Sequence, residues 1–138
     1  MDGYGKRVLI VDDDEHTRRL IGILLEQAGC YNVVLVPDGL DALYEVKKRH
    51  FDAVITDYSM PILNGQQLLG RIHAIRPEIP VILVSAHFPE YPSKVNEAPF
   101  FACLRKPFDK TILLELLRTA VHMPEPTYAG HTPSTTER

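Results

Sequence analysis

Five short runs of apolar residues divide the chain at intervals that suit strands separated by helices. They are Val8–Val11, Val33–Val36, Ala53–Thr56, Val81–Val84 and Phe100–Leu104. The runs read as apolar on both faces instead of alternating with polar residues, and this is typical of strands that are covered by helices on both sides. The pattern therefore predicts a parallel sheet with helices on its two faces.

Helical patterns lie between these runs. Apolar residues recur at helical spacing at Leu20, Ile21, Leu24, Leu25 and Ala28. We expect Asp14 to be the N-cap of this helix and Gly29 its C-terminal stop. Further helices are predicted after Asp38, from about Gly65 and after Asp109. Because parallel neighbours need crossover connections, the alternation predicts a doubly wound α/β domain.

Two segments depart from this alternation. The fourth crossover, residues 87–99, contains three prolines, so we expect a short or distorted helix there. Residues 123–138 have several prolines and no apolar period, which predicts a disordered tail or the start of a linker. We therefore expect one domain over residues 1–122.

Composition excludes several classes of protein. A chain of 138 residues that is 45% hydrophobic and 24% charged fits one globular domain. The net charge of -3 and the lack of a basic stripe argue against direct binding of nucleic acid. No apolar run approaches the ~18 residues of a membrane span, so we expect a soluble, cytoplasmic protein. Cys30 and Cys103 lack metal-type spacing, and we expect two buried thiols without a disulfide.

Acidic residues stand where the first and third runs end. Asp12 and Asp13 follow the first run, and Asp57 follows the third. Ligands of open α/β sheets bind outside the carboxyl ends of the strands, so neighbouring strands would bring the three carboxylates into one crevice. Like charges so close disfavour common ionisation unless a cation lies between them. Oxygen donors without thiolate or imidazole point to Mg²⁺.

The ends of the other two strands add a hydroxyl and a cation. Ser85 ends the fourth strand, and Lys106 follows the fifth. A divalent ion, an ammonium and a hydroxyl around one carboxylate would bind the oxygens of a phosphoryl group. Asp57 is then the better candidate for the nucleophile, because the adjacent Asp12 and Asp13 look like a pair of metal ligands. A dinucleotide or flavin binder would have a Gly-rich phosphate loop after the first strand. This chain has acids at that place, which argues against such a binder.

These residues resemble the receiver domain of two-component response regulators, of the chemotaxis-regulator type. The resemblance lies in the acid pair at Asp12, in Asp57 followed by "YSMP" and "NG", in Ser85 followed by a small residue, and in "KPF" at Lys106. It covers about the first 122 residues. It implies a flavodoxin-like sheet in the order 2-1-3-4-5. It also implies that a sensor histidine kinase or a histidine phosphotransfer protein donates a phosphoryl group to Asp57.

The resemblance further implies a set of metal ligands. Asp13 and Asp57 would bind Mg²⁺ directly, together with the backbone carbonyl of Ser59. Asp12 would act directly or through water.

Roles for the remaining site residues follow from the same resemblance. Lys106 would pair with the phosphate, and a cis peptide would precede Pro107. Ser85 would shift to bond a phosphoryl oxygen, and this shift would alter the surface of the fourth and fifth strands and their helices. Ser59 and His87 would tune how long the phosphoryl group persists.

The chain departs from the family at two places. An aromatic switch residue usually stands three positions before the lysine, where this chain has Cys103. Phe101, two residues earlier, is expected on the same face of the strand. In the family, the fourth crossover often mediates output or dimerisation. Because prolines interrupt this segment here, the sequence leaves open whether the protein forms a homodimer.

Two other functions are compatible with part of the pattern. A haloacid-dehalogenase-type phosphatase would use Asp12 as nucleophile with Asp14 two residues on, but it leaves Asp57 without a role, and the later acidic pair of that family is missing. A receiver-like binding module without phosphorylation would not need the intact acids with Ser85 and Lys106. We therefore predict a phosphorylatable signalling receiver that acts on no external metabolite.

Overall fold

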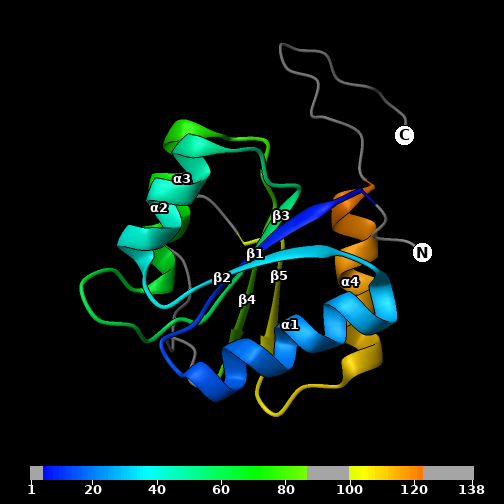
Figure 1. Ribbon diagram of the computed structural model, residues 1–138. Coiled ribbons are helices and arrows are strands. Elements are labelled where there is room, and N and C mark those ends of the chain that lie inside the picture. The colour runs from blue at the N-terminus through cyan, green and yellow to red at the C-terminus, as the bar shows by residue number, and fades with distance from the viewer. Residues whose placement is uncertain (1–4, 87–99, 123–138) are drawn as a thin grey trace.

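The computed structural model describes residues 5–86 and 100–122, which form a five-stranded parallel sheet with helices on both faces (Figure 1). The elements are β1 (Arg7–Val11), α1 (Glu15–Gly29), β2 (Asn32–Val36), α2 (Gly39–Lys48), β3 (Ala53–Thr56), α3 (Gly65–Ile75), β4 (Val81–Ser85), β5 (Ala102–Arg105) and α4 (Lys110–Val121). The strand order is β2-β1-β3-β4-β5 and all pairs are parallel. This order confirms the predicted doubly wound, flavodoxin-like fold.

Two predictions fall outside the described residues. These are the short fourth helix within residues 87–99 and the tail at residues 123–138. The domain boundary at residue 122 therefore stays a prediction. Among the helices of the described ranges, none combines the length and the apolar character that crossing a bilayer requires.

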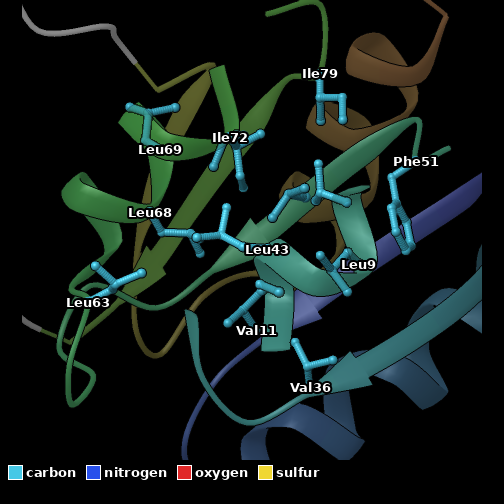
Figure 2. Packing of buried hydrophobic residues seen from close by; sticks show 14 residues of the cluster. Leu9, Val11, Val36, Leu43, Phe51, Leu63, Leu68, Leu69, Ile72 and Ile79 are labelled. Carbon is cyan, nitrogen blue, oxygen red and sulfur yellow. The ribbon is translucent and has the colours of Figure 1, made fainter. Parts of the chain in front are cut away.

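The core consists of two apolar clusters, one on each face of the sheet. Figure 2 shows the cluster under α2 and α3, to which β1 contributes Leu9 and Val11. The other two apolar residues of β1, Val8 and Ile10, point to the cluster under α1 and α4. All four are at most 1% exposed. Fully burying such a side chain stabilises the fold by about 1.5–3 kcal/mol before entropy losses, so β1 anchors both layers.

The edge strands are less covered than their sequences suggested. Every residue of β3 and β4 is buried, whereas β2 and β5 each carry exposed positions. The expectation of two buried thiols is wrong, because Cys103 is exposed on the edge strand β5 and Cys30 is exposed where α1 ends. No disulfide joins Cys30 and Cys103 in the part of the chain that the structure describes.

The ends of α1 depend on short-range contacts. Asp14 is the N-cap and its carboxylate accepts the Thr17 N–H, as predicted. The helix includes Gly29, however, and the residue that ends it in the left-handed conformation is Cys30, at φ 61°. Gly29 instead leaves room for an aromatic ring, since a Cβ there would lie 2.4 Å from Cε2 of Tyr31. The C-terminal stop was therefore predicted one residue early.

The loop between β3 and α3 contains a strained turn. The Leu63 N–H donates to the carbonyl of Pro61 at 2.8 Å, and Ile62 between them has φ 75°. This is a γ-turn of the rare type with positive φ, which disfavours a β-branched side chain. The turn directs Leu63 into the core. There it packs against Gly39, where a Cβ would lie only 2.9 Å from the Cβ of Leu63.

A second close approach joins α3 to the end of β3. The Gly65 N–H donates to the carbonyl of Tyr58 at 2.8 Å. A Cβ on Gly65 would lie 2.6 Å from the carbonyl oxygen of Asp57 and 3.0 Å from Cα of Tyr58. Because both neighbours are backbone, they have little room to move, so glycine is what allows α3 to begin against Asp57.

Replacing Ile62 tests the strain in the γ-turn. Ile62→Asn should stabilise the protein by about 1 kcal/mol, because Asn tolerates positive φ and the 70% exposed Ile62 side chain contributes little burial. Urea unfolding measures the change. Ile23→Asn is the control, since Ile23 is 50% exposed within α1 and should gain nothing. An Ile62→Asn variant that gains no stability relative to the wild type, or that changes by the same amount as Ile23→Asn, would contradict the strain.

Replacing Gly65 tests the close approach at Asp57. Gly65→Ala should destabilise the protein by about 1–3 kcal/mol through overpacking against backbone. Gly70→Ala, in the same helix, should stabilise it by about 0.5–1 kcal/mol, because a Cβ there meets no atom of the described residues within 4 Å. Unfolding free energies of the two variants should therefore move in opposite directions. A neutral Gly65→Ala would show that the approach is looser than described.

Candidate functional site

Three carboxylates meet at the carboxyl edge of the sheet. The parallel ladder continues beyond the strands, since the Asp12 N–H donates to the carbonyl of Val36 at 3.3 Å and the Asp57 N–H donates to that of Val11 at 3.0 Å. Asp12, Asp13 and Asp57 each place a carboxylate oxygen within 4.8 Å of the other two. The structure thus brings together the three acids that were predicted to share one crevice.

The three acids differ in their access to water. Asp12 is 2% exposed and Asp57 is 9% exposed, whereas Asp13 is exposed. Backbone donors partly replace the lost water, because the Asp14 N–H bonds Oδ1 of Asp12 at 2.9 Å and the Tyr58 N–H bonds Oδ1 of Asp57 at 2.8 Å. Two charges are therefore held in a low-dielectric crevice while the third faces solvent.

Lys106 brings a cation into the crevice. Its N–H donates to the carbonyl of Ser85 at 3.0 Å, which carries the β4–β5 ladder past the end of β5. Its Nζ lies 3.0 Å from Oδ2 of Asp12 and 3.8 Å from Oδ1 of Asp57. The bond to Pro107 is cis, as the resemblance implied. The ammonium thus lies near both buried carboxylates and closer to Asp12.

The charge balance of the crevice affects Asp12 most clearly. Burial raises the pKa of this carboxyl above its ordinary value of 3.8, although the Asp14 N–H and the Lys106 ammonium act in the opposite direction. The neighbouring Asp57 raises it further. One ammonium therefore does not fully compensate two buried carboxylates beside a third acid, and an additional cation would complete the balance.

Three other predicted site residues are placed less directly. Ser85 is 1% exposed at the end of β4, beside Lys106 along the ladder. Ser59 is exposed in the loop after Asp57. His87 lies outside the described residues. The roles assigned to these residues by resemblance stay predictions.

Cys103 does not share a face with Phe101. Cys103 pairs with Leu83 in the β4–β5 ladder. The Leu83 side chain lies on the side of α3, because its Cδ1 would be 3.2 Å from a Cβ placed on Gly65. Phe101 instead packs against the cluster under α1 and α4. The prediction of a shared face is wrong: the Phe101 N–H already donates to the carbonyl of Val81 at 2.8 Å, but the ring of Phe101 packs on the side of α1 and α4. A switch role for Cys103 remains a prediction.

Arg18 reaches the site although the sequence did not single it out. Its Nη1 donates to the backbone carbonyl of Asp12 at 2.8 Å. The apolar positions and the caps of the first helix predict the helix but assign no role to its charged residues. The available signal was a cation five residues after Asp13, at the start of a helix that the acids precede.

The arrangement suits a hard divalent cation. All three clustered donors are carboxylates, and Mg²⁺ prefers oxygen ligands and keeps part of its water. Both oxygens of Asp12 already accept hydrogen bonds, whereas Asp13 faces solvent. The donor set therefore fits Mg²⁺, with the Lys106 ammonium beside Asp12 as a second source of positive charge.

Asp12 should make the stability of the fold depend on pH. Because its pKa is raised, the folded protein keeps this proton to a higher pH than the unfolded chain does. In metal-free buffer, the free energy of unfolding should fall as the pH rises from 3.8 through the pKa of the folded state, and Asp12→Asn should remove this part of the fall. Urea unfolding from about pH 4 to about pH 8 measures both curves. Parallel curves for the two proteins would contradict the raised pKa.

Proteins of known sequence resemble this chain over most of its length. The transcriptional regulatory protein GlrR of Escherichia coli K12 is 32% identical over 121 residues, which are 86% of this chain and 27% of GlrR. The chain thus spans about a quarter of that relative. The chemotaxis protein CheY-3 of Vibrio cholerae is 36% identical over 114 residues, which are 80% of this chain and 88% of CheY-3.

A solved structure has a similar fold. The receiver domain of the sensor histidine kinase PA1611 from Pseudomonas aeruginosa PAO1, which holds a magnesium ion in its active-site cleft, is 25% identical with a TM-score of 0.75. The similarity covers 86% of this chain and 98% of that one. The family model of the response regulator receiver domain matches residues 8–118. With the acidic crevice at the carboxyl edge of a β2-β1-β3-β4-β5 sheet, these matches show that the chain belongs to the response regulator receiver domain family.

Proposed function

We propose that this receiver domain accepts a phosphoryl group on Asp57 in a reaction that depends on Mg²⁺. The donor would be a phosphohistidine of a sensor kinase or of a phosphotransfer protein. The observation that carries the proposal is the meeting of Asp12, Asp13 and Asp57 around the ammonium of Lys106. A phosphoryl group needs this combination of a nucleophile with nearby positive charge.

The chemistry follows from the positions of these groups. A carboxylate oxygen of Asp57 forms a bond to phosphorus while the bond from phosphorus to the histidine nitrogen breaks, and the nitrogen keeps the electron pair. Lys106 lies 3.8 Å from Asp57 and would pair with a phosphoryl oxygen. Bound Mg²⁺ would supply charge neutralisation on the transferred group, held by Asp13, Asp57 and the Ser59 carbonyl, with Asp12 bound directly or through water.

The reverse half of the cycle regenerates the receiver. Water attacks phosphorus, inorganic phosphate leaves, and the Asp57 carboxylate is restored. Ser59 and His87 would influence this rate from the rim of the site. No external metabolite takes part, so the only reactions of the chain would be phosphorylation and dephosphorylation of Asp57.

Signalling would begin at the ends of β4 and β5. Ser85 is buried at the end of β4 and adjoins Lys106 along the ladder, so a bond from its hydroxyl to the new phosphoryl group would shift this edge of the sheet. Cys103, opposite Leu83, would sense that shift in place of the usual aromatic residue. We place this relay in the cytoplasm, with a homodimer as one form in which the shift could be read out.

Labelling with a small phosphodonor tests the proposal. Acetyl phosphate with Mg²⁺ should add one phosphoryl group to each wild-type chain, and none to Asp57→Asn. Asp12→Asn should still be labelled, but more slowly, because it retains the nucleophile and loses one acid of the cluster. Mass spectrometry of the intact protein measures the label, and a chelator in place of Mg²⁺ is the control.

The same experiment separates the competing functions. Sustained hydrolysis that depends on Asp12 and survives Asp57→Asn would indicate a phosphatase of the haloacid-dehalogenase type. A chain without any Mg²⁺-dependent label would be a binding module, and the proposed phosphorylation would be wrong.

A further inference from the structure

We infer that Arg18 is a positioning residue that holds the acidic turn between β1 and α1 in the geometry that binds Mg²⁺. The inference rests on the proposed Mg²⁺-dependent function. Its structural basis is one contact, in which the partly buried Arg18 side chain turns back along the first turn of α1 and donates from Nη1 to the carbonyl oxygen of Asp12 at 2.8 Å.

This contact completes the fixation of Asp12. The backbone N–H of Asp12 donates to the carbonyl of Val36, Oδ1 accepts the Asp14 N–H and Oδ2 accepts Nζ of Lys106. These three bonds hold the start of the residue and its side chain. The bond from Arg18 holds the carbonyl, which is the end of Asp12 that leads into Asp13.

Fixing the carbonyl of Asp12 also orients Asp13. The carbonyl oxygen of Asp12 and the N and Cα atoms of Asp13 belong to one planar peptide unit. If that plane rotated, the exposed carboxylate of Asp13 would move away from the other two acids. Arg18 therefore controls the one carboxylate of the cluster that burial does not hold in place.

The chemistry of arginine suits this role. A guanidinium keeps its charge at every relevant pH and offers several donors in a rigid plane, so it can hold a carbonyl with little loss of its own freedom. It also places a permanent cation beside a turn that carries adjacent acids. Arg19, the next residue, differs in that its side chain is 69% exposed and pairs with Glu15 on the surface at 3.6 Å. Arg19 is therefore a matched control for charge and helix position.

Magnesium titration of four proteins tests the inference. The wild type, Arg18→Met, Arg18→Lys and Arg19→Met are titrated with MgCl₂ by isothermal calorimetry, at low and at high ionic strength. Arg18→Met should bind Mg²⁺ about tenfold more weakly than the wild type, which is the usual effect of losing a partner that orients metal ligands. The weakening should be at least as large at high ionic strength, because losing a cation by itself favours Mg²⁺ binding and salt screens that gain, whereas salt does not screen the lost geometry. Arg18→Lys, which keeps a donor and the charge, should fall between, and Arg19→Met should match the wild type.

A second readout reports the contact itself. The carbonyl ¹³C resonance of Asp12 in metal-free protein should shift in Arg18→Met and hardly change in Arg19→Met. Urea unfolding without metal shows whether each variant is folded. If Arg18→Met does not fold, the comparison of Arg18→Lys with the wild type decides, and it should still show weaker binding with a shifted Asp12 carbonyl.

The outcomes separate this inference from the proposed function. A wild type that binds no Mg²⁺ at millimolar concentration would overturn both. A wild type that binds Mg²⁺, with folded Arg18 variants that bind it equally well or more tightly, would overturn the role of Arg18 alone. Equal Mg²⁺ affinities of Arg18→Met and the wild type at high ionic strength would also overturn it, because salt screens the gain from losing a repelling cation and would leave only the effect of the lost geometry.

Discussion

The structure of this receiver domain depends on how it tolerates acidic groups packed together at one edge of its sheet. Asp12 and Asp57 are nearly removed from water and lie within reach of Asp13, an arrangement that like-charge repulsion and desolvation both oppose. Backbone donors and the ammonium of Lys106 offset part of this cost. The part of this cost that is not offset raises the pKa of Asp12. The same uncompensated negative charge favours the binding of a further cation.

The rest of the fold supplies the stability and the rigidity that such a site requires. Two apolar clusters pack against the central strands, one on each face, so the ends of β1 and β3 have little freedom to separate. The ladder bond from Asp57 to Val11 and the close approach of Gly65 hold the backbone beneath the acids. The strained turn at Ile62 lies in the same loop, in keeping with the concentration of backbone strain near functional sites.

Much of this architecture could be predicted from the sequence because it follows from local patterns. Apolar runs of strand length identified all five strands, and Asp14 was recognised as a cap from its place before a helical period. The errors arose where local patterns do not carry the information. Whether a strand lies at an edge depends on the sheet order, so the exposure of Cys103 could not be predicted, and Gly29 serves a contact with Tyr31 instead of a left-handed stop.

By itself, the sequence determined which groups stand at the carboxyl ends of the strands, because a parallel sheet aligns those ends whatever the details of packing. It thereby determined the acids, the lysine and the family they resemble. Only the tertiary structure decided how these groups are placed relative to one another: Lys106 lies closer to Asp12 than to Asp57, and Asp13 keeps its access to water. The physical reason is that electrostatic energy varies over a few ångströms, and such distances are set by the packing of elements far apart in the chain.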